Sequence, residues 1–162
     1  MHPLLLLKLL LLLMLANGAP IAVKDVLRRH LAYPVDGGTV LGDGRPLFGK
    51  SKTVRGLSVS LVATAIGSAL LGLGWRIGLI ISAVAMAGDL CSSLVKRRLN
   101  VAPSGRATGL DQIPESLLPL LAVRADLALA AWDILVVVGL FFVGEMLLSI
   151  LFYRLHLRDH PY

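Results

Sequence analysis

Long apolar runs are the feature that most limits what this chain of 162 residues can fold into. A helix needs about 20 mostly apolar residues to cross the hydrocarbon core of a bilayer. Such runs occur at 3–23, 56–74, 77–95, 113–124 and 127–153. Only helices and closed barrels satisfy every backbone polar group inside a membrane. The sequence therefore predicts an all-α, polytopic membrane helix bundle of about five transmembrane helices, forming one integral membrane domain over 1–162.

Two of these runs differ from an ordinary span. The fourth is only about a dozen residues long, so we expect it to re-enter or to cross half of the membrane. The first contains Lys8, and Asn17, Gly18 and Pro20 predict a break near its end. It is also similar to a signal peptide, with cleavage near 16–19 as the alternative to retention. No basic residue precedes the apolar run, which favours retention.

The composition excludes several other classes of protein. Apolar residues make up 56% of the chain and charged residues 16%. In a soluble domain, about half of the residues are apolar and about a quarter are charged. One cysteine, Cys91, rules out an internal disulfide and a cysteine metal cluster. The net charge of +6 fits contact with anionic membrane lipids or a phosphorylated substrate. We expect no nucleic-acid partner, because the basic residues are divided among short loops with few aromatics.

The basic residues also predict the orientation in the membrane. With the N-terminus outside, seven lie in the 17–55 loop, four in the 95–112 loop and two in the tail, all on the inner side. Only Arg76 and Arg124 then lie outside, with Lys8 inside a span. The excess of Lys and Arg in cytoplasmic loops favours this arrangement. We therefore expect a multi-pass protein of the cell (inner) membrane with glycine-rich and basic loops facing the cytoplasm.

The first of these loops has the composition of an anion-binding segment. The stretch 34–56 contains six glycines, which let a backbone turn tightly and approach a ligand. Ser51 or Thr53 can cap the following helix, and Lys52 and Arg55 then lie at its start. Cations at a helix N-terminus oppose the helix dipole, so their presence indicates an anion held there by free N–H groups. The alternative is a turn-rich loop whose lysines contact lipid head groups.

A second polar cluster lies near the inner end of the third span. Asp89, Ser92 or Ser93, and Lys96 share one helical face. A carboxylate at this depth costs roughly 2.5–3.5 kcal/mol, so Asp89 should face the protein interior, either paired or on a metal. An ion pair between Asp89 and Lys96 is the simpler alternative. Arg97 and Arg98 alone are typical of the charges that end a span.

Two further acids, Asp111 and Glu115, flank the start of the fourth span. Asp111 is also suited to cap that helix. Carboxylates close to several Lys and Arg residues favour a Mg²⁺–phosphate site over a proton path. Elsewhere, Ser60, Thr64 and Ser68 form a small-residue stripe that suits close helix packing, either inside the chain or in a homodimer.

These segments together resemble the CDP-archaeol synthase family, whose members are membrane cytidylyltransferases distantly similar to phosphatidate cytidylyltransferases. The resemblance runs in order through 16–20, 43–49, 52–56, 88–99 and 110–112. It implies transfer of CMP from CTP to a lipid phosphate, with Mg²⁺ as cofactor. The implied catalytic residues are Asp89, Lys96 and Asp111; the implied metal ligands are Asp89, Asp111 and Glu115; and the implied CTP contacts are Asp43, Lys52, Thr53, Arg55, Ser93 and Arg97.

The chain departs from the family pattern at one position. A second acid usually follows Asp111 by three residues, but here that position is Pro114, followed by Glu115. Either Glu115 substitutes for the missing acid or one metal contact is lost. The alternatives are a cytidylyltransferase for another phospholipid or a polyprenyl phosphate, or a small transporter or assembly subunit using Asp89 and Glu145. The basic glycine-rich loop disfavours the transporter, since permeation does not require such a loop.

Overall fold

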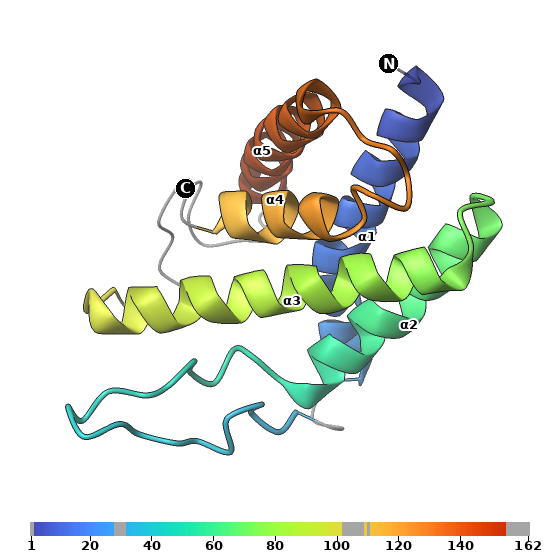
Figure 1. Ribbon diagram of the computed structural model, residues 1–162. Helices are drawn as coiled ribbons and strands as arrows, with labels where there is room; N and C mark the ends of the chain where they lie inside the picture. Colours follow the sequence, from blue (N-terminus) through green and yellow to red (C-terminus); the bar gives the residue numbers. More distant parts are fainter. Residues whose placement is uncertain (1, 28–31, 102–108, 110, 155–162) are drawn as a thin grey trace.

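The computed structural model describes residues 2–27, 32–101, 109 and 111–154. Four of the basic residues assigned above to the inner side, Arg28, Arg29, Arg106 and Arg158, lie outside these ranges. Five helices follow one another along the chain, with no strand in the described ranges (Figure 1). Their bounds are α1 (Pro3–Leu27), α2 (Val54–Leu70), α3 (Trp75–Arg98), α4 (Gln112–Ala122) and α5 (Ala131–Arg154). The all-α prediction is confirmed.

Three of the five helices are long and apolar enough to cross a membrane, over Pro3–Val23, Trp75–Arg98 and Ala131–Leu148. The 17 residues of α2 extend over about 25 Å, and the 11 residues of α4 over about 16 Å. Because the hydrocarbon core is about 30 Å thick, α4 is long enough for only about half of it. Its length agrees with the expected half-crossing segment, which packs against both α3 and α5.

The predicted break near Pro20 is wrong, because α1 continues through this residue to Leu27. Pro20 has no N–H, so the carbonyl oxygen of Ala16, one turn earlier, has no helical donor. The hydroxyl of Ser60 in α2 donates to that oxygen at 2.7 Å, and Ser82 Oγ of α3 lies 2.7 Å from Ser60 Oγ. A neighbouring helix thus supplies the missing hydrogen bond, as membrane proteins commonly require.

The small-residue stripe of α2 is buried inside the chain. Ser60, Thr64 and Ser68 have no exposed surface, and α2 packs closely on α3. A Cβ added to Gly78 of α3 would lie 2.4 Å from the carbonyl oxygen of Thr64, so only glycine fits there. Of the two alternatives for the stripe, the structure therefore supports packing within the chain, and a homodimer gains no support from it.

Apolar side chains of α1 form much of the core. Leu9, Leu12 and Leu13 are fully buried and belong to one cluster with Val137 and Phe141 of α5. Side chains from α3 and α4 complete the same cluster. The first apolar run is therefore a structural part of this bundle.

Candidate active site

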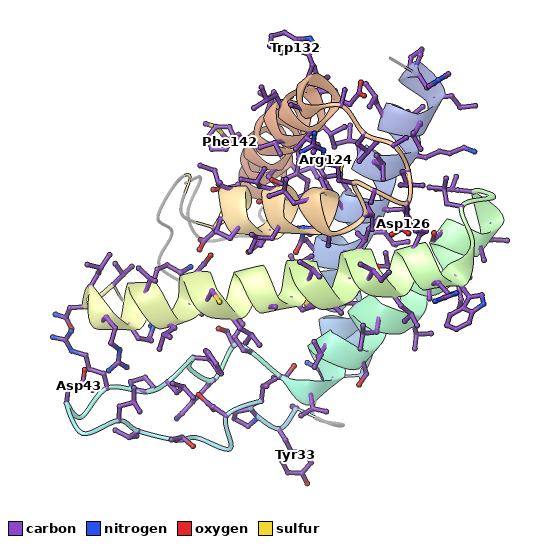
Figure 2. The ribbon with its side chains drawn as sticks, in the orientation of Figure 1. Tyr33, Asp43, Arg124, Asp126, Trp132 and Phe142 are labelled. Atoms are coloured by element: carbon purple, nitrogen blue, oxygen red, sulfur yellow. The ribbon has the colours of Figure 1, made fainter. Side chains whose placement is uncertain are left out.

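The polar residues gather where α3 ends and α2 and α4 begin. Between α1 and α2, the segment 34–53, called the hairpin below, runs out beside the C-terminal half of α3 and returns (Figure 1). Backbone hydrogen bonds join its arms, from Val35 N to Lys52 O at 2.8 Å and from Leu47 N to Thr39 O at 2.9 Å. Asp43 lies at the hairpin tip, far from the labelled Arg124 and Asp126 at the opposite end of the bundle (Figure 2).

Asp36 holds the hairpin in shape. Its carboxylate accepts hydrogen bonds from the backbone N–H groups of Gly38 and Phe48, both at 2.9 Å, and of Gly49 at 3.3 Å. Removal from water opposes ionisation of this carboxyl, but the backbone donors outweigh that effect and lower the pKa of Asp36. Its position before two glycines is a recognisable turn signal, although no functional pattern in the sequence marks it.

Lys52 connects the hairpin to α3 by an ion pair with Asp89. The next residue, Thr53, caps α2, with its hydroxyl accepting from Gly56 N at 3.2 Å, as the sequence predicted. The cap places Lys52 directly before the first turn of α2. The simpler alternative, an ion pair between Asp89 and Lys96, is wrong, because Asp89 pairs with Lys52 from the hairpin.

Lys96 instead forms an ion pair with Asp111, with Nζ 2.8 Å from Oδ2. Asp111 occupies the N-cap position of α4, but its side chain makes no capping hydrogen bond. The capping interpretation is therefore wrong. Its second oxygen, Oδ1, is buried and has no hydrogen-bond partner in the described part of the chain. A buried acceptor left in this state is a position where a ligand group can bind.

Glu115, in the first turn of α4, lies near Asp89. Its carboxyl lies close enough to those of Asp89 and of Glu145 in α5 to feel the charge of both. Two carboxyl groups in contact need a proton or a cation between them, because two bare carboxylates repel. Gly88 makes this contact possible: a Cβ there would lie 2.6 Å from the carbonyl oxygen of Pro114.

Cations surround these acids. Arg55 comes from the first turn of α2, and Lys96 and Arg97 from the last turn of α3, with exposed fractions of 7%, 8% and 6%. Buried cations are costly unless they face anions. Ser93, on α3, is also buried. The structure thus places buried guanidinium and ammonium groups at the helix ends that also carry Asp89 and Asp111.

Asp43 is placed apart from these groups. It lies at the hairpin tip, where it forms an ion pair with Arg98 and accepts from the backbone N–H of Arg45 at 3.1 Å. Sequence reasoning treated Arg98 as an ordinary charge at the end of a span and gave Arg45 no individual role. Their part in holding the hairpin depends on contacts between segments over fifty residues apart, which local spacing does not reveal.

The donor set suits magnesium held jointly by protein and ligand. Across the residues described, no three His, Cys, Asp or Glu side chains form a group that could hold a metal. Mg²⁺ usually binds one or two carboxylates and takes its remaining ligands from phosphate oxygens and waters. The Asp89–Glu115 contact and the unpartnered Oδ1 of Asp111 fit that mode.

The fold and the site define an integral membrane protein in which acids and cations from separate helices meet at one end of the bundle. A family model, described as CarS-like CDP-archaeol synthase, matches residues 4–162. The chain therefore belongs to this family, as its motifs indicated.

Known proteins agree with this assignment. A CDP-archaeol synthase of Sulfurisphaera tokodaii is 34% identical over 92% of this chain and 90% of its own length. One of Sulfolobus acidocaldarius is 31% identical over 92% and 91%. A solved structure, described as an intramembrane enzyme for archaeal membrane lipid biosynthesis, is 30% identical with a TM-score of 0.74 and covers 88% of this chain and 91% of that one.

Proposed function

We propose that this protein transfers CMP from CTP to a lipid phosphate, giving a CDP-activated lipid and pyrophosphate. The names of its relatives favour CDP-archaeol as the product. The observation that carries the proposal is the meeting of Lys52 with Asp89, and of Asp89 with Glu115, in a chain of this family. This meeting puts a phosphate-binding cation beside carboxyl groups able to hold Mg²⁺.

In the reaction, an oxygen of the lipid phosphate attacks the α-phosphorus of CTP. The bond from that phosphorus to the oxygen bridging to the β-phosphate breaks, and pyrophosphate leaves with that electron pair. No covalent step falls to a side chain, so positioning and charge neutralisation supply the catalysis. Bound Mg²⁺ would add charge neutralisation at the phosphate oxygens.

The side chains then have separate tasks. Lys52 and Arg55, at the start of α2, hold the triphosphate together with the free N–H groups of the helix. Lys96 and Arg97 bind the lipid phosphate or the departing pyrophosphate. Asp89 and Glu115 would hold Mg²⁺, and Asp111 would contribute through the oxygen that has no partner. Glu115 thereby takes the place of the acid that the family carries at position 114.

The site faces the cytoplasm in this proposal, and the protein lies in the cell membrane. The hairpin, the start of α2 and the end of α3 carry seven of the twelve described Lys and Arg residues, whereas Arg76 and Arg124 lie near the opposite helix ends. The positive-inside rule places the former on the cytoplasmic side, where CTP is available. The lipid chains reach the site from the inner leaflet.

The test uses the purified protein in nanodiscs with CTP, Mg²⁺ and a lipid phosphate, followed by release of pyrophosphate and formation of the CDP-lipid. Archaeal-type ether and diacyl phosphates are compared as substrates. Asp89→Asn should lower turnover by about 10²- to 10³-fold, a loss typical for one group that stabilises charge in the transition state. Asp126→Asn, at an exposed aspartate far from the site, is the matched control. Unchanged turnover in Asp89→Asn would refute the assignment.

A further inference from the structure

The hairpin is attached to α3 at two separate places. At its base, Lys52 pairs with Asp89, and at its tip, Asp43 pairs with Arg98. The two partners on α3 are nine residues apart, which corresponds to about 13 Å along the helix. The hairpin therefore follows the last turns of α3 and is fixed at both ends (Figure 1).

At the tip, one arginine of α3 contacts the hairpin, and one arginine of the hairpin contacts the end of α3. Arg98 of the helix donates to the carboxylate of Asp43 and to the carbonyl oxygen of Pro46, the latter at 2.8 Å. Arg45 of the hairpin donates in return to the carbonyl oxygens of Arg97 and Arg98. Terminal carbonyls of a helix lack helical donors and carry partial negative charge, so a guanidinium is a favourable partner for them.

The Asp43 carboxylate makes its hydrogen bonds at the hairpin tip. Its two oxygens accept from Arg98 and from the backbone N–H of Arg45. It lies at the end of the hairpin opposite Lys52, close to the C-terminal end of α3 (Figure 2). These contacts favour a role in holding the hairpin over the CTP contact that the family resemblance implied for this residue.

We propose that Asp43, Arg45 and Arg98 form a clasp that positions Lys52 for the triphosphate without touching the substrate. The inference rests on the proposed function. When the clasp opens, the Lys52–Asp89 ion pair alone ties the hairpin to α3, so the hairpin loses its place beside the helix as soon as CTP draws Lys52 away from Asp89. Binding of CTP must then order the hairpin as well, so the apparent affinity falls by the fraction of chains in the competent state. Once CTP is bound, the site is complete.

The test compares Asp43→Asn, Arg98→Gln and the double variant with Lys50→Gln, which removes an exposed cation from the same hairpin. Without substrate, hydrogen exchange at the amides of Leu41 and Leu47 should speed up about tenfold in the clasp variants only, because both amides bond across the hairpin. In turnover, KM for CTP should rise about five- to thirtyfold while kcat changes less than threefold. The double variant should be no worse than the worse single variant, since both single variants remove the same Asp43–Arg98 ion pair.

Three results would overturn the proposal. Unchanged exchange in Asp43→Asn means that the clasp does not hold the hairpin. Faster exchange with an unchanged KM means that it holds the hairpin without positioning Lys52. A tenfold loss of kcat, additive between Asp43→Asn and Arg98→Gln, means that Asp43 contacts the substrate. If the wild-type protein does not use CTP, the proposed function fails, but the exchange data still decide whether the clasp holds the hairpin.

Discussion

Replacing Gly88 by alanine should disable the protein through a contact between two helices. A Cβ at this position would lie 2.6 Å from the carbonyl oxygen of Pro114, 2.8 Å from its carbon and 3.2 Å from the nitrogen of Glu115. Ordinary carbon–oxygen contacts begin near 3.3 Å, so α4 must move away from α3 by about 0.5–1 Å. The obstacle is backbone, which cannot swing aside as a flexible side chain does.

That displacement has two costs. Overpacking of this kind destabilises a protein by about 1–3 kcal/mol, partly offset by the roughly 1 kcal/mol that alanine gains over glycine in a helix. It also separates Glu115 from Asp89, and a 1 Å misplacement in a reacting site costs about 10²-fold in rate. The melting temperature should therefore fall by a few degrees while CMP transfer falls about a hundredfold.

Gly139 of α5 provides the matched control, because a Cβ there meets nothing within 4 Å. Gly139→Ala should be as stable as the wild type or slightly more stable, with full activity. The assay is thermal unfolding in detergent together with pyrophosphate release for both variants. If Gly88→Ala and Gly139→Ala behave alike in both measurements, the close approach of α3 and α4 does not position the acids.

Three further substitutions test other contacts. Lys52→Met should tighten Mn²⁺ binding in the absence of nucleotide, because it frees Asp89. The same substitution should weaken CTP binding about 10- to 100-fold, because a charged contact is lost. Titration measures both affinities. Ser60→Ala should lower stability by about 0.5–2 kcal/mol in thermal unfolding, since the carbonyl oxygen of Ala16 loses its donor. For Asp36, the lowered pKa means that hairpin protection against pepsin is complete above an ordinary pKa of about 3.9 and declines only below it. Asp36→Asn should be cleaved faster than the wild type where Asp36 is ionised, and the difference should shrink as the pH falls and Asp36 is protonated.

The helices could be predicted because apolar runs of sufficient length have few other structures available. The sequence did not predict that α1 continues past Pro20. Pro20 indicates a break in isolation, and only the hydroxyl of Ser60, supplied by another helix, removes the penalty. In the same way, the need of Asp89 for a partner followed from its depth in the third span, but the identity of that partner did not.

Helical spacing places Asp89 and Lys96 on one face, but seven residues correspond to about 10 Å along the axis. The ion pair forms with Lys52 because the hairpin returns beside α3, a tertiary arrangement absent from any local pattern. Glu115 shows the opposite case. The sequence offered it as one of two alternatives, a replacement one residue out of register, and the close approach of Pro114 to Gly88 brings its carboxyl near Asp89.

Binding of Mn²⁺ in the presence of CTP, followed by electron paramagnetic resonance, tests most directly whether acids from α3 and α4 share one ion. The account predicts one bound Mn²⁺ per chain with CTP, and an affinity at least tenfold lower in both Asp89→Asn and Glu115→Gln, with Asp126→Asn unchanged. Wild-type affinity in the first two variants would contradict the account.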